Sequence, residues 1–115
     1  MSLDVGLSLD IDTGDKELMN VLLFDANVTH NLAVMADKAG IYQALWRPET
    51  LGVSCAKDIV DSLETGLKRL IEAPEYFKGF EAYNGWGKYE DFVHFVDKYL
   101  TACKSYPKAK ILTSV

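Results

Sequence analysis

The sequence predicts an α+β fold with about four helices packed on one face of a small, mainly antiparallel sheet. Alternating apolar and polar residues open the chain, and apolar residues at three- and four-residue spacing recur from the middle to near the C-terminus. The chain has 115 residues, of which 49% are hydrophobic. We therefore expect one domain, residues 1–115, with a substantial core.

Two stretches near the N-terminus predict a β-hairpin. Residues 3–11 alternate apolar and polar side chains, which is typical of a strand with one buried face. Asp12-Thr-Gly-Asp15 supplies turn residues. Residues 17–24 are almost continuously apolar, so we expect a second strand covered on both faces. A short final strand at Ile111 and Leu112 is expected to return to this hairpin.

The first helical stretch follows a segment rich in turn and cap residues, 25–31. Asn27 or Thr29 is expected to cap a helix that Gly40 ends. Residues 41–46 predict a short helical turn, because Pro48 disfavours helix at the residue before it.

The second half of the chain predicts longer helices. One opens at Ser54, and its expected buried face includes Leu67 and Ile71. A short helix begins at Pro74. After an Asn84-Gly-Trp-Gly87 turn, the last helix presents an apolar face that reaches Cys103.

Composition excludes several classes of function. A formal net charge of −5 argues against nucleic-acid binding. No apolar run approaches the roughly 18 residues of a membrane span, and aspartates interrupt any secretory signal at the start. Cys55 and Cys103 are expected to be free thiols. We therefore expect a cytoplasmic protein with no membrane partner.

The most distinctive candidate site is Trp86, which stands between two glycines. Asn84, Tyr83 and Tyr89 flank it, and aromatic residues of this kind dominate protein interfaces. Alternatively, the glycines turn the backbone so that Trp86 fills the core. The sequence leaves both interpretations open.

Two further candidate sites are His30 with Asn31, and Trp46 with Arg47. His30 has the chemistry of a general base, and the guanidinium of Arg47 suits acidic ligands. The alternative is a helix cap around His30 and a structural corner in which Trp46 is buried. No second His or Cys stands at ligand spacing from His30, so we expect no metal site and no cofactor.

Three stretches resemble small phage and prophage proteins for which no activity is established. They are Asn27-Val-Thr-His-Asn-Leu32, Leu45-Trp-Arg-Pro-Glu49 and Asn84-Gly-Trp-Gly-Lys-Tyr-Glu90. The resemblance covers roughly residues 25–110, including Ala39-Gly-Ile-Tyr42. It implies a phage or bacterial cytoplasmic setting and transfers no catalytic role.

Two hypotheses about function follow. The first is a non-enzymatic module that binds a protein through an acidic and aromatic surface at Trp86, Tyr83, Tyr89 and Trp46. The second is a small-molecule binder or enzyme whose pocket joins His30, Asn31, Arg47 and Trp86. Self-association through an exposed sheet edge also stays open. An exposed Trp86 would favour the first hypothesis, and a closed pocket holding His30 and Arg47 the second.

Overall fold

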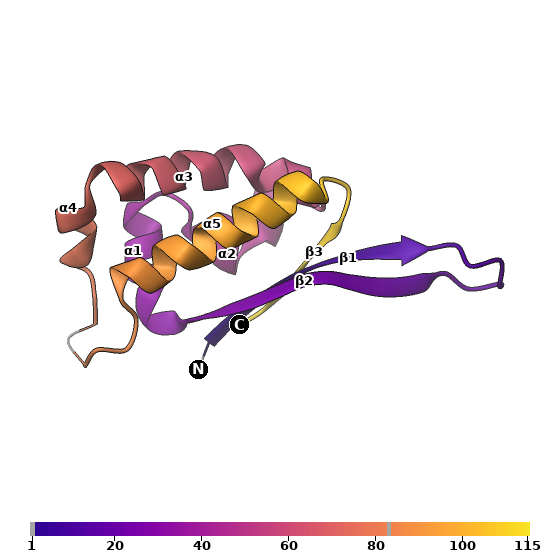
Figure 1. Cartoon of the computed structure of the whole chain (residues 1–115), viewed down its shortest axis with the longest axis horizontal. Helices are drawn as coiled ribbons and strands as arrows, with labels where there is room; N and C mark the ends of the chain where they lie inside the picture. The colour runs from indigo at the N-terminus through magenta and orange to yellow at the C-terminus, as the bar shows by residue number, and fades with distance from the viewer. Residues whose placement is uncertain (1, 83) are drawn as a thin grey trace.

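A computed structural model describes residues 2–82 and 84–115 and confirms the α+β prediction (Figure 1). In this part of the chain, a three-stranded antiparallel sheet accompanies five α-helices, close to the expected four. The molecule is elongated, with extents of 52 × 27 × 23 Å. The helices gather at one end, and the hairpin extends away from them at the other (Figure 1).

The sheet has the strand order β2-β1-β3, so the N-terminal strand lies at its centre. The strands are β1 (Ser2–Ile11), β2 (Met19–Thr29) and β3 (Lys110–Ser114). The alternation in β1 places Leu3, Val5 and Leu7 in the core, as the period of two requires. The predicted hairpin and the returning final strand are both confirmed.

The second strand differs from the prediction of a strand that is covered on both faces. It continues to Thr29, and of its residues Val28 alone is buried. The reason is its position, because β2 is an edge strand and its first half runs beyond the helices (Figure 1). Leu22 and Met19 are therefore exposed, although their apolar character predicted burial.

The helices are short except for two. Their bounds are α1 (Ala33–Lys38), α2 (Tyr42–Trp46), α3 (Val60–Glu72), α4 (Pro74–Lys78) and α5 (Tyr89–Ser105), with 3₁₀ turns η1 (His30–Leu32), η2 (Pro48–Leu51) and η3 (Ala56–Ile59). Thr29 caps η1, since its hydroxyl accepts a hydrogen bond from the Asn31 N–H at 3.3 Å. Gly40 ends α1 with a φ of 80°.

The α3 helix starts later than the sequence predicts. The Asp58 carboxylate accepts hydrogen bonds from the Ser54 and Cys55 amides, both at 3.3 Å. The next amide, that of Ala56, donates to the Ala109 carbonyl instead of entering a helix. These bonds hold residues 56–59 as a 3₁₀ turn before the α-helix begins.

The core lies between the sheet and the antiparallel pair α3 and α5. Phe92, Val96 and Tyr99 project inward from α5, and the Tyr99 ring stacks on Phe24 of β2 with centroids 5.9 Å apart. Leu63 of α3 is fully buried in the same cluster. Within residues 2–82 and 84–115, no helix has the length and apolar character needed to cross a bilayer.

Candidate functional site

The glycine turn between α4 and α5 holds Trp86 out in solvent. Its side chain is 72% exposed. The Trp86 N–H donates to Oδ1 of Asn84 at 3.0 Å, and the Trp86 carbonyl accepts from Nδ2 of Asn31 at 3.1 Å. The backbone of this residue is therefore fixed on both sides while its indole stays free. Tyr83 lies outside the described residues.

Gly87 explains why the turn needs glycine. It has a φ of 104°, and a Cβ placed there would lie 3.0 Å from Thr29 and 3.1 Å from Leu32. A larger residue would be strained in its backbone and would press the turn away from η1. Gly87 thus lets the turn dock against η1, whereas Gly85 meets no neighbour and only its φ of 80° favours glycine. Trp86 does not fill the core.

Tyr89 lies at the start of α5 and is buried. Its hydroxyl donates to the Leu70 carbonyl at 2.6 Å, and its backbone N–H donates to the Glu81 carboxylate at 2.6 Å. Burial raises the pKa of the Tyr89 hydroxyl. The bond from the hydroxyl connects α5 to α3. Because Tyr89 is buried, little of its surface is available to a partner.

The structure does not gather His30, Asn31, Trp46 and Arg47 in one pocket. They form two separate hydrogen-bonded contacts and leave Arg47 exposed. Trp46 is buried, and its Nε1 donates to Nδ1 of His30 at 3.1 Å. Asn31 contacts the Trp86 turn, as described above. The Arg47 side chain is 52% exposed and lies 3.9 Å from Glu49.

His30 and Arg47 line none of five hollows found on the surface of residues 2–82 and 84–115. Over the same residues, no group of three or more His, Cys, Asp or Glu side chains is arranged to hold a metal ion.

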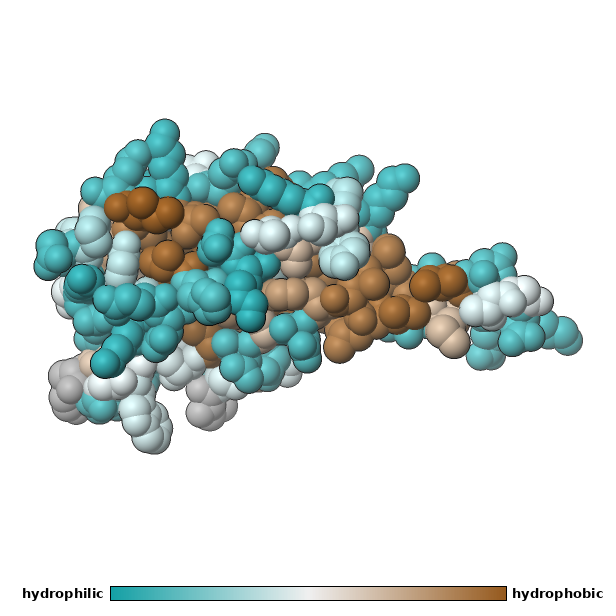
Figure 2. All heavy atoms as spheres, in the orientation of Figure 1, coloured by the Kyte–Doolittle hydropathy of each residue, from teal (hydrophilic) through white to brown (hydrophobic). Residues whose placement is uncertain are grey.

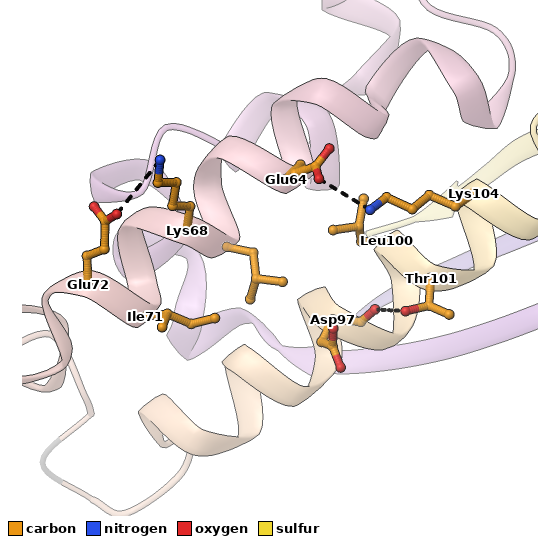
Figure 3. A pocket seen from close by; sticks show the side chains of 9 residues that line it. Glu64, Lys68, Ile71, Glu72, Asp97, Leu100, Thr101 and Lys104 are labelled. Atoms are coloured by element: carbon orange, nitrogen blue, oxygen red, sulfur yellow. Dashed lines mark hydrogen bonds and ion pairs between the residues drawn. The ribbon is translucent and has the colours of Figure 1, made fainter.

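Sequence reasoning missed a groove between α3 and α5. Two adjoining hollows of about 460 and 410 Å³ form it, and they share Leu67, Ile71 and Asp97. Figure 3 shows the first of these hollows. We call their combined surface the α3–α5 groove; its other lining residues are Glu64, Lys68, Glu72, Tyr89, Glu90, Val93, His94, Leu100, Thr101 and Lys104. Apolar surface shows between the hydrophilic side chains of the two helices (Figure 2).

Ile71 corrects the prediction for α3, since it was expected on the buried face and is 58% exposed. The apolar arc of α3 is wider than α5 and the sheet can cover. Leu63 and Leu70 take the centre of that arc and are buried, whereas Ile71 lies at its margin. An apolar arc that is too wide for its neighbours was the one signal of the groove in the sequence.

Most of the charged side chains along the groove form ion pairs. Lys104 lies 3.3 Å from Glu64 and so bridges α5 and α3, and Lys68 lies 3.9 Å from Glu72 (Figure 3). Glu90 pairs with Lys78 at 3.8 Å. Among the described residues, no Lys, Arg or His forms an ion pair with Asp97.

Comparison with known proteins assigns the chain to no family: no protein-family model, no curated protein and no solved structure matches it.

Proposed function

We propose that this protein is a non-enzymatic interaction module of phage or prophage type, which binds a protein partner through Trp86. One observation carries the proposal: an indole that is 72% exposed stands on a turn whose backbone is anchored. Tryptophan is among the residues most enriched at the centres of binding hot spots.

The energy available from Trp86 is large enough to matter. A tryptophan side chain buries roughly 200 Å² in a well-packed contact, so covering its exposed part is worth about 3–4 kcal/mol. Binding normally loses part of such a gain through the ordering of loops. The hydrogen bonds to Asn84 and Asn31 hold the turn before any partner arrives, which reduces this loss.

The three stretches that resemble phage proteins meet around this turn. Asn31, from the first stretch, bonds to the Trp86 carbonyl of the third. His30, also from the first stretch, accepts the hydrogen bond of Trp46, which belongs to the second. This convergence supports a single structural unit that presents Trp86, with Trp46 as its buried support. The negative net charge favours a partner with a basic rim.

The geometry gives weaker support to a small-molecule pocket or an enzyme. Trp46 already occupies Nδ1 of His30, so that nitrogen is not available to abstract a proton. Arg47 lies beside Glu49 at the surface.

The first test measures the exposure of Trp86 in solution. In a Trp46→Phe variant, iodide should quench most of the remaining fluorescence of the folded protein. The second test is affinity capture from a bacterial extract, because the resemblance to phage and prophage proteins implies a bacterial setting. A specific partner should be retained by the wild type and by Leu112→Ala, which truncates an exposed apolar residue elsewhere, and lost with Trp86→Ala.

Folded Trp86→Ala protein that retains the same partner as the wild type would disprove the proposal. So would weak quenching in the Trp46→Phe variant, because a shielded indole cannot serve as the contact.

A further inference from the structure

We infer that the α3–α5 groove is a second binding surface, which accepts an amphipathic helix carrying lysine or arginine beside its apolar face. This inference goes beyond the function proposed for Trp86, because it concerns different residues and a partner of stated chemistry.

The shape of the groove suits a helix. Ile71 (labelled in Figure 3) and the partly buried Leu67 lie on the α3 wall, and the partly buried Val93 lies on the α5 wall, so that both walls offer apolar side chains. A third helix that packs over two antiparallel helices buries apolar residues at positions i, i+3, i+4 and i+7. Both walls are helical, so the groove has no strand edge to which an extended peptide could add.

The length of the groove sets the size of the partner. Its α5 wall runs from Tyr89 to Lys104. At about 1.5 Å per residue this wall spans about 22 Å, which matches a partner helix of about four turns. Ile71 lies in both hollows and is 58% exposed, so it is the main apolar contact that the groove offers.

The charges of the groove select a basic partner. Four carboxylates, Glu64, Glu72, Glu90 and Asp97, line it against two lysines, Lys68 and Lys104. Both lysines already pair with groove carboxylates. Asp97 lies in both hollows, and none of the described cations pairs with it. A lysine or arginine flanking the apolar face of a bound helix could pair with this exposed carboxylate.

The test uses a fluorescein-labelled peptide of about 18 residues, long enough for the groove. It carries leucines at i, i+3, i+4 and i+7 spacing, lysines beside them and glutamines on the far face. A matched peptide has glutamate in place of each lysine. Fluorescence anisotropy measures the Kd of each peptide for the full chain, and we expect the lysine peptide to bind at least about tenfold more tightly.

Matched variants locate the binding. Ile71→Ser should raise the Kd of the lysine peptide about tenfold, whereas Val34→Ser, at a similarly exposed residue of α1, should change it less than about twofold. Asp97→Asn should raise the Kd about threefold or more, and Asp91→Asn, which removes the same charge from α5 outside the groove, should not. Matching unfolding temperatures show that each variant is folded.

Trp86→Ala should leave the Kd of the peptide unchanged, so failure of this inference is distinguishable from failure of the proposed function. Equal losses with Asp97→Asn and Asp91→Asn would overturn the inference, because they would indicate general attraction to an acidic protein. An unchanged Kd with Ile71→Ser would overturn it as well. So would a dimer that Ile71→Ser dissociates in analytical ultracentrifugation, since the groove would then be an interface between two copies.

Discussion

The indole Nε1 of Trp46 donates a hydrogen bond to Nδ1 of His30 over 3.1 Å. Because Nδ1 accepts this bond, the neutral imidazole carries its proton on Nε2. The bond satisfies the only polar atom of a tryptophan side chain that is 3% exposed. The ring of Tyr42 stacks on the same indole with centroids 5.5 Å apart. His30 therefore serves the packing of Trp46, which in turn supports the segment that anchors the Trp86 turn.

We predict that His30→Ala lowers the free energy of unfolding by about 1–3 kcal/mol, because the loss of packing and of the acceptor for the buried indole N–H outweighs removal of the unpartnered Nε2–H of His30. His94→Ala is the matched control, since His94 is exposed on α5 and should cost less than about 0.5 kcal/mol. Urea unfolding followed by circular dichroism measures both. Equal costs for the two variants would contradict the role assigned to His30.

We expect Gly66→Ala to destabilise the protein, although helices usually prefer alanine to glycine. Gly66 lies within α3, where alanine would normally gain about 1 kcal/mol over glycine. Here a Cβ would overlap Cγ2 of Ile41, whose side chain is buried. Gly66→Ala should therefore destabilise the protein by about 1–3 kcal/mol.

Ile41 supplies the control for Gly66. In an Ile41→Ala background the obstructing methyl group is absent, and Gly66→Ala should become neutral or stabilising. Thermal unfolding of the two single variants and the double variant gives the coupling. Stabilisation of the wild type by Gly66→Ala would show that the helices move apart without cost.

Removing the hydroxyl of Tyr99 and removing that of Tyr89 should change the stability of the fold in opposite directions. The Tyr99 hydroxyl is buried and has no hydrogen-bond partner among the described residues, so Tyr99→Phe should stabilise the fold by up to about 1–2 kcal/mol. The Tyr89 hydroxyl donates to the Leu70 carbonyl, so Tyr89→Phe should cost about 1 kcal/mol. Chemical denaturation measures both variants. Changes of the same sign would contradict this account of the buried hydroxyls.

Local patterns were enough to predict most of the fold. The alternation that begins at residue 3 specified a strand that buries Leu3, Val5 and Leu7, although Ile11 at its end is exposed and Ser8 of the polar face is buried. The spacing of Phe92, Val96 and Tyr99 specified the inner face of α5. These signals depend on neighbours within one turn or one strand. Gly40 and Pro74 likewise act through their own backbone, so α1 ends and α4 begins at or next to the expected positions.

Which surfaces stay uncovered could not be predicted, because this depends on contacts between distant residues. The position of Trp86 depends on Asn31, 55 residues earlier in the chain. Leu22 and Ile71 are as apolar as core residues, and only the extent of neighbouring helices decides that they are exposed. The α3–α5 groove arises from the same cause. An apolar residue in the sequence does not reveal whether another element reaches it.

The last prediction concerns the stability of the protein in alkali, through Cys103. Burial raises the pKa of the Cys103 thiol to about 12, from an ordinary value of 9.0. Below pH 9 the thiol is protonated in both the folded and the unfolded chain, and its contribution to stability is fully present. Between pH 9 and about 12 the unfolded chain releases this proton first, so this thiol lowers the free energy of unfolding by up to about 1.4 kcal/mol per pH unit.

The pH dependence of urea unfolding between about pH 8 and 11 tests this prediction. The decline should be shallower in Cys103→Ala than in the wild type, although the cavity left by the thiol lowers the stability of the variant at every pH. Burial also raises the pKa of Tyr99 and of Tyr89, so part of the decline should persist in Cys103→Ala and become shallower again when Tyr99→Phe is added. Equal slopes in the wild type and Cys103→Ala would mean that the thiol ionises as readily in the folded protein as in the unfolded chain, and that its surroundings admit water.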